Sequence, residues 1–336
     1  MSVDLTSKKS KILLRGFGSI GRQYANILAE LGCTEIDVIS NYPIDRNSLP
    51  EFKFITFVNK SEIRRADYDL VIIASETKSH LKDFEDLRRL GKNVLIEKPI
   101  ASNLEDVKNY TRTLNSKKVF VSSPLRFYLN FEKLPEMINS LGELYLIEVE
   151  CKSWMPDWRP TRDYQDGYWA DPGQGGVLRD LIHEIDYPLA LFGLPNAVNC
   201  KLEFGTESEP FSVDTKADLN WITSTGADVR IHLDYFSRKS SRAMTVNGEK
   251  GEIYWDLLNG KLEVKDNSGK VRFSNSEKTL PSAALYRQVS SVLLENERFY
   301  PSSVQEAIDA LAIVDAGRKA DLNQQESVVT YIDLSH

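Results

Sequence analysis

The stretch KILLRGFGSIGRQYANILAE, residues 11–30, decides how the first part of this chain folds. Ile12 to Leu14 form a short apolar run that is typical of a buried strand. Gly16, Gly18 and Gly21 follow with GxGxxG spacing, and apolar residues then recur at helical intervals. A strand, a glycine turn and a helix in this order predict a dinucleotide-binding unit, although the glycines alone would also fit an ordinary turn.

Each glycine of this unit has a reason in the geometry of phosphate binding. Gly16 permits a tight turn, Gly18 lets the backbone approach a pyrophosphate, and Gly21 lets the helix pack close to the strand. The free N–H groups at the start of the helix then face the anion. We therefore expect the segment to contact the cofactor through Gly16, Phe17, Gly18, Ser19, Ile20 and Gly21.

Composition indicates an ordinary globular protein of about two domains, since the chain has 336 residues. The net charge of −7 argues against a nucleic-acid or anionic-membrane surface. No apolar run approaches the roughly 20 residues that span a bilayer, and the polar N-terminus does not resemble a secretory signal, so we expect a cytoplasmic protein. The 3 cysteines lie far apart and the 4 histidines form no HxH or HExxH pattern, so we expect neither a disulfide framework nor a metal site.

The order of the predicted elements indicates two architectures. Strands and helices alternate up to residue 123 and predict a doubly wound parallel sheet, the Rossmann fold. Runs with period two dominate afterwards, such as 143–151 and 229–236, with Asn-Gly turns between some of them. We therefore expect a dinucleotide-binding domain over residues 1–123 and a mostly antiparallel α+β substrate domain over residues 124–336.

Candidate cofactor contacts follow the ends of the predicted strands, where α/β sheets bind ligands. Ser40 and Asn41 occupy the place where an Asp or Glu would favour NAD. Arg46, a little further on, could meet a 2′-phosphate or could simply be solvated. Ser75 ends the buried run 68–75, and Thr77 lies at the start of the next segment. His80 opens the helix that follows, where a histidine is more often structural than catalytic.

The triplet Glu97-Lys98-Pro99 directly follows another predicted strand, residues 93–96. Proline lacks the N–H that a sheet needs and fixes the turn, so Glu97 and Lys98 are held at the carboxyl end of the sheet. This placement suits a functional pair in which both residues contact the cofactor, and an ordinary loop ion pair is the alternative.

The segment 175–193 predicts one helix with two different faces. Its apolar residues share a broad side, whereas Asp180, His183 and Tyr187 fall together on the opposite side. An Asp three residues before a His can orient the imidazole, and the set would suit general acid/base chemistry. A solvated polar face is the alternative.

The loop 153–171 is crowded with aromatic and charged residues. Flat rings and arginines suit a sugar-like ligand with an anionic group, while some rings would pack the domain interface instead. The candidates for substrate contact in this loop are Trp158, Arg159, Tyr164 and Trp169.

Taken together, these motifs resemble the Gfo/Idh/MocA oxidoreductase family. The resemblance is carried by GFGSIG at 16–21, ASETKSH at 74–80, EKPI at 97–100, GGVLRDLIHEID at 175–186 and NGEKGEIYWD at 247–256. It implies a nicotinamide cofactor on the first domain and a sugar, cyclitol or derivative against the second sheet. It also implies dimers or tetramers formed through the open sheet face, and a branch of the family associated with bacterial surface-sugar pathways.

The resemblance also implies roles for individual residues. Lys98 would lie beside the nicotinamide and the reacting oxygen, His183 would be the acid/base and Asp180 would assist it. Two positions depart from the pattern: Arg179 stands where many members have the Asp, and Pro124 replaces a common Asn, which affects the expected substrate contact of Arg126.

Two classes of function fit these observations. The first is an NAD(P)-dependent oxidoreductase that transfers a hydride between nicotinamide and a hydroxyl or keto carbon of a sugar-like substrate. The second is a regulator or scaffold that binds NAD(P)H without turnover. The regulator would need the glycines but not Lys98, Asp180 and His183 together, so their joint presence favours the enzyme.

We predict that the protein binds NADP somewhat more tightly than NAD, because no carboxylate follows the second strand at Ser40. Dissociation constants for NADPH and NADH, measured by quenching of tryptophan fluorescence, test this. A clearly tighter NADH complex would show that another group holds the ribose.

Overall fold

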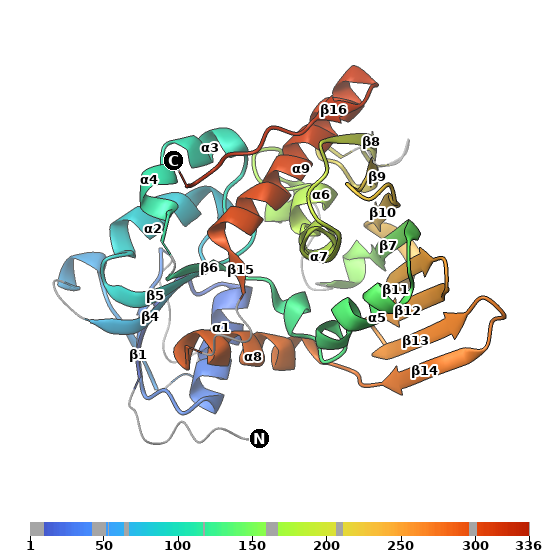
Figure 1. Cartoon of the computed structure of the whole chain (residues 1–336). Coiled ribbons are helices and arrows are strands. Elements are labelled where there is room, and N and C mark those ends of the chain that lie inside the picture. The colour runs from blue at the N-terminus through green and yellow to red at the C-terminus, as the bar shows by residue number, and fades with distance from the viewer. Residues whose placement is uncertain are drawn as a thin grey trace.

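The computed structural model describes residues 10–41, 52, 54–63, 67–116, 118–158, 167–205, 211–295 and 301–335. These residues form two sheets with helices around and between them, as Figure 1 shows. The parallel sheet lies at the left of the figure and the second sheet at the right. The expected combination of a Rossmann-type sheet and a mostly antiparallel sheet is therefore confirmed.

The first sheet has the strand order β15-β6-β5-β4-β1-β2-β3, and every pair except β15–β6 is parallel. The order reverses between β1 and β4, so a ligand crevice is expected at the carboxyl ends of these two strands. The strands are β1 (Lys11–Arg15), β2 (Glu35–Ile39), β3 (Ile55–Phe57), β4 (Tyr68–Ile73), β5 (Gly91–Ile96), β6 (Val119–Val121) and β15 (Ser302–Ser303).

Successive strand residues point to opposite faces of this sheet, and they are buried on both faces. On β1, Ile12 and Leu14 join one core cluster while Leu13 joins the other. Around the sheet lie α1 (Ser19–Glu30), α2 (His80–Leu87), α3 (Leu104–Lys108) and α4 (Thr111–Leu114).

The second sheet has the order β14-β13-β12-β11-β7-β10-β9-β8-β16, with only β10–β7 parallel. One face carries the largest core cluster and is covered by helices, and the other face is polar. Its strands are β7 (Leu144–Trp154), β8 (Ala197–Glu203), β9 (Lys216–Ile222), β10 (Asp228–Asp234), β11 (Phe236–Gly248), β12 (Gly251–Asp256), β13 (Lys261–Asp266), β14 (Val271–Ser276) and β16 (Ser327–Val328).

Helices from this part of the chain fill the space between the sheets, where Figure 1 shows α6, α7 and α9. The expected single helix over 175–193 is wrong, because it divides at Leu181–Ile182 into two short helices. The helices are α5 (Leu134–Ser140), α6 (Val177–Asp180), α7 (His183–Phe192), α8 (Pro281–Leu293) and α9 (Val304–Asn323).

Late segments of the chain return to the first sheet. Helix α8 packs on α1 through Leu285, Val289 and Val292, and β15 adds an antiparallel edge strand to β6. The start of α9 contributes Val304 and Ile308 to the core on the other face. Within the described residues, no helix has both the length and the apolar character that crossing a bilayer requires.

Candidate active site

The glycine segment joins β1 to α1, and its three glycines are required for different reasons. Gly16 has φ +99°, and a Cβ there would lie 2.3 Å from the carbonyl oxygen of Ala74. A Cβ on Gly21 would lie 2.3 Å from the carbonyl oxygen of Gly16. A Cβ on Gly18 would meet nothing within 4 Å. Gly16 and Gly21 are therefore needed for packing, whereas Gly18 borders open space.

This open space suits an anionic ligand. Gly18 is the N-cap of α1 and supplies no side-chain cap, so the first N–H groups of the helix are not satisfied by that residue. Ser19 and Ile20 lie beside it, exposed and half-buried. Phe17 differs, because its ring is buried edge-on against Phe52 and Phe57, so its side chain belongs to the core.

The ends of β2 and β4 supply further candidates. Asn41 is exposed and Ser40 is half-buried, and Arg46 lies outside the described residues. Thr77 is buried after β4, and the Ser75 hydroxyl is buried without a hydrogen-bond partner among the described residues. A polar cofactor bound at the carboxyl end of the sheet would supply the hydrogen bond that this buried hydroxyl lacks.

His80 does not fit the expected cofactor contact. Its ring is only 1% exposed, with Nδ1 2.9 Å from the Pro99 carbonyl oxygen and Nε2 3.0 Å from the Ser75 carbonyl oxygen. Burial, the largest effect, lowers its pKa. His80 therefore ties the loop after β4 to the loop after β5.

Glu97 and Lys98 leave the end of β5 in different directions. Glu97 is buried, and its carboxylate accepts hydrogen bonds from the Tyr24 hydroxyl and from the Lys98 N–H. The Glu97 carboxylate is therefore occupied by partners from the protein itself and does not support the expected cofactor contact. Lys98 Nζ reaches the other side of the domain junction, where it binds the carbonyl oxygen of Asp180 and lies 3.3 Å from Asp180 Oδ1.

Asp180 holds Lys98 and two tyrosines, and it does not hold His183. The Tyr168 hydroxyl donates to Oδ1 at 2.9 Å, and the Tyr235 hydroxyl donates to Oδ2 at 3.3 Å. The spacing-based expectation that Asp180 orients the imidazole is wrong, because the chain turns between α6 and α7. Sequence reasoning did not assign either tyrosine to the site; Tyr168 lies in the aromatic loop, whereas Tyr235 follows β10 without a distinguishing pattern.

Tyr187 is also misplaced by the helical pattern. It is 0% exposed and packs edge-on against Trp255, with ring centroids 5.7 Å apart. The broken helix turns this residue into the core beneath α7, so it does not share a polar face with His183.

His183 opens α7 and, among the described residues, makes no hydrogen bond or ion pair. It lines a small cavity at the domain junction together with Lys98, Ser122, Asp186 and Ser302. Burial lowers the pKa of His183 well below its ordinary value, and the positive charges of Lys98, Arg242 and Arg126 lower it further. The ring is therefore neutral at pH 7 and has a nitrogen available to accept a proton.

The expected substrate contact through Arg126 is not supported by its position. Its guanidinium forms two bonds with Asp186, of 2.8 Å and 2.7 Å, and a third with Glu306 of 2.6 Å. All three nitrogens are thus engaged within the protein, and the flanking carboxylates hold the arginine in a structural role.

The aromatic loop is only partly described. Trp169 is buried in the core cluster of the second sheet, so its position does not support the predicted contact with the substrate. The backbone of Trp158 ends a short 3-10 helix, while Arg159 and Tyr164 lie outside the described residues.

Comparison with known proteins shows the family of this chain. Residues 10–124 match the model of an oxidoreductase family with an NAD-binding Rossmann fold, GFO_IDH_MocA, and residues 131–254 match the C-terminal domain of the same family. The chain belongs to the Gfo/Idh/MocA oxidoreductase family.

Sequence identity to individual curated relatives is low. An uncharacterized oxidoreductase of Schizosaccharomyces pombe is 28% identical over 205 residues, covering 58% of this chain and 53% of that protein. The myo-inositol 2-dehydrogenase of Thermotoga maritima is 27% identical over 189 residues, covering 53% of each chain. The chain thus spans about half the length of the curated relatives it matches.

Solved structures show the same fold over almost the whole chain. Levoglucosan dehydrogenase in complex with NADH has a TM-score of 0.81 at 17% identity, covering 97% of this chain and all of that one (100%). A putative myo-inositol dehydrogenase of Sinorhizobium meliloti has a TM-score of 0.76 at 19% identity, covering 96% and 100% of the two chains.

We predict that Gly18→Val abolishes cofactor binding but leaves the fold intact, because the added side chain would enter open space where the pyrophosphate approaches. Gly16→Ala is the contrasting variant: strain at positive φ costs about 1–3 kcal/mol, so it should lower the midpoint of urea unfolding. NADH titration and urea unfolding measure the two effects. A folded Gly18→Val protein with wild-type affinity for both NADH and NADPH would contradict the assignment.

Proposed function

We propose that this protein is an NAD(P)-dependent oxidoreductase acting on a hydroxyl or keto carbon of a sugar or sugar derivative. When bound, the nicotinamide would supply or accept the hydride. The observation that carries the proposal is the meeting of Lys98 and His183 at one cavity, reached from opposite sides of the domain junction. The family and the glycine segment support the cofactor assignment.

The side chains divide the chemistry between them. Lys98, paired with Asp180, would bind the reacting oxygen and stabilise the charge that develops on it. His183, neutral and unpartnered among the described residues, would accept the hydroxyl proton during oxidation and return it during reduction. Asp180 would hold Lys98 in place, which differs from the assistance to His183 expected from spacing.

The cofactor would lie along the carboxyl edge of the first sheet. The backbone of Gly16–Gly21, Ser75 and Thr77 would hold it, with Ser40 and Asn41 near the adenosine ribose. The lean towards NADP rests on the missing carboxylate at position 40 and on Arg46; an NADH complex is known for the levoglucosan dehydrogenase neighbour.

A polyhydroxylated substrate is supported by the relatives, whose names include myo-inositol 2-dehydrogenase and levoglucosan dehydrogenase. Trp158, Arg159 and Tyr164 stay the candidates for its recognition, since their loop leads to Tyr168 at the site. A role in surface-sugar metabolism in the cytoplasm belongs to the same proposal. The alternative, a regulator that binds NAD(P)H without turnover, has no use for Lys98 and His183 at one cavity.

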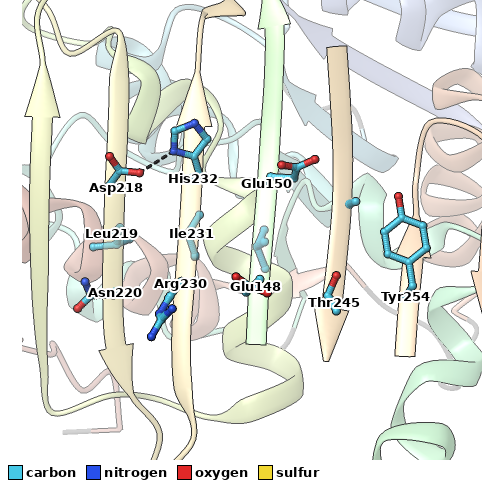
Figure 2. Close-up of a pocket in the computed structure, with 12 residues that line it drawn as sticks. Glu148, Glu150, Asp218, Leu219, Asn220, Arg230, Ile231, His232, Thr245 and Tyr254 are labelled. Atoms are coloured by element: carbon cyan, nitrogen blue, oxygen red, sulfur yellow. Dashed lines mark hydrogen bonds and ion pairs between the residues drawn. The ribbon is translucent and has the colours of Figure 1, made fainter. Parts of the chain in front are cut away.

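The proposed assembly is a homodimer or homotetramer formed through the open face of the second sheet. Figure 2 shows side chains of both charges standing on this face from neighbouring strands, among them Glu148, Arg230 and His232. His232 Nδ1 lies 2.6 Å from Asp218 on the next strand. Nucleic acid and membrane are not expected partners, given the charge of −7.

We predict that light scattering shows an oligomer. Ile231 is unsuitable for a test substitution because its side chain is buried in the core. Arg230→Glu reverses a charge on the open face and should shift the protein towards monomer. Lys108→Glu on α3, an exposed cation away from the second sheet that is paired with Glu105, is the control and should not. A monomeric wild-type protein at micromolar concentration would contradict the assembly.

Lys98→Met and His183→Ala should each lower turnover by about 100- to 10,000-fold while NAD(P)H still binds. The measurement is NAD(P)-linked absorbance on a panel of sugars and polyols that includes myo-inositol and levoglucosan, with fluorescence titration of the cofactor. Asp180→Asn should cost less, since it weakens the hold on Lys98 without removing a reacting group. Nearly full activity in the His183→Ala protein would overturn the assignment.

The pH dependence follows from the lowered pKa of His183. Below its pKa the ring is protonated and cannot accept a proton, so kcat/KM for alcohol oxidation should fall only in the acidic range below 6.5. This acid limb should vanish in His183→Ala. A limb at or above pH 6.5 would show that another group is the base.

A further inference from the structure

We propose that Gln288 is a positioning residue that fixes Lys98 and the His183 helix relative to each other across the domain junction. The proposal rests on the roles proposed above for Lys98 and His183. Gln288 lies in α8, a helix that packs on α1 and that no motif singled out, and its side chain is 0% exposed. A fully buried amide must find partners for its donor and its acceptor.

The amide of Gln288 binds two consecutive residues that follow β6. Its Nε2 donates to the Ser122 hydroxyl at 3.1 Å, and its Oε1 accepts the Ser123 N–H at 2.7 Å. Both serines are buried. The chain connection from the first sheet to the second passes through these residues, so Gln288 holds the start of the connection.

From Ser122 the hydrogen bonds run to Lys98. The Ser122 hydroxyl lies 3.3 Å from the Tyr24 hydroxyl, and Tyr24 in turn bonds Glu97. Because Tyr24 has one hydroxyl proton, which Glu97 receives, the serine must be the donor in the Ser122–Tyr24 contact. The second oxygen of Glu97 accepts the N–H of Lys98 at 3.2 Å. Every donor in this half of the chain thus points towards Glu97.

From Ser123 the hydrogen bonds run to the His183 helix. The Ser123 hydroxyl accepts the N–H of Ser302 at 2.8 Å. The Ser302 hydroxyl donates to Asp186 Oδ1 at 2.6 Å, and Asp186 lies one turn after His183 on α7. A set of hydrogen bonds, buried except for the partly buried contact between Lys98 and Glu97, therefore connects the backbone of Lys98 with α7, and Gln288 is at its centre.

The connection matters because the two proposed reacting groups come from different sheets. Misplacement by about 1 Å can cost about 100-fold in rate, since the reacting atoms must be aligned. Apolar packing at a junction tolerates small shifts, whereas a fully satisfied buried polar network favours a single arrangement. The Gln288 network supplies this constraint, and its members Ser122, Asp186 and Ser302 also line the cavity.

The decisive variant is Gln288→Met, which keeps the length of the side chain but removes its donors and acceptor. We expect kcat to fall about 10- to 100-fold while the dissociation constant of NADH stays within about twofold, because the cofactor segment is untouched. Hydrogen–deuterium exchange should rise in both 97–101 and 180–186. Tyr24→Phe and Ser302→Ala interrupt the two halves separately and should each lower kcat, and neither effect should multiply with that of Gln288→Met.

The matched control is Asn93→Leu. Asn93 Nδ2 also binds α8, through the Val292 carbonyl oxygen at 3.4 Å, but it lies outside the network. Its variant should keep wild-type kcat. A folded Gln288→Met protein with wild-type kcat overturns the proposal, as does an equal loss in Asn93→Leu. If Gln288→Met does not fold, wild-type kcat in both Tyr24→Phe and Ser302→Ala overturns it. Full activity in Lys98→Met or His183→Ala would instead refute the proposed function.

Discussion

The ion pair between Lys98 and Asp180 is the interaction on which the arrangement of the site depends. Lys98 follows β5 of the first sheet and Asp180 ends α6, which covers the second sheet, so the pair joins the two halves of the molecule. Asp180 is buried and also receives hydroxyl protons from Tyr168 and Tyr235. A buried carboxylate with one cation and two further donors is satisfied, which a single ion pair would not achieve.

Further ion pairs with buried carboxylates lie near His183. Residues 180–186 supply three carboxylates, and each binds a cation from a different element: Asp180 with Lys98, Glu184 with Arg242 on β11, and Asp186 with Arg126. Paired buried charges of this kind select one arrangement more than they stabilise the fold. The three cations also surround a histidine that has no partner of its own among the described residues, and they favour its neutral form.

Three late elements of the chain, β15, α8 and α9, return to the first sheet. Strand β15 pairs with β6, and the start of α9 enters the core beside β5 and β6. Helix α8 brings Gln288 against the serines that follow β6. Ser122, Ser302 and Ala307 line the cavity together with Lys98 and His183, so the packing of the late helices contributes to the relative placement of these two residues.

The sequence by itself determined the Rossmann-type sheet, the glycine turn and the residues most suited to chemistry. Those features depend on local pattern: apolar runs, glycine spacing, and Lys98 placed between a buried strand and a proline. Tertiary structure decided the partners. In the folded chain the predicted helix is interrupted between Asp180 and His183, Tyr187 lies in the core, and Asp180 pairs with Lys98. Arg126 and His80 are also engaged within the protein. Pairs such as Lys98 and Asp180, 82 residues apart, form through the packing of two sheets, which no local spacing records.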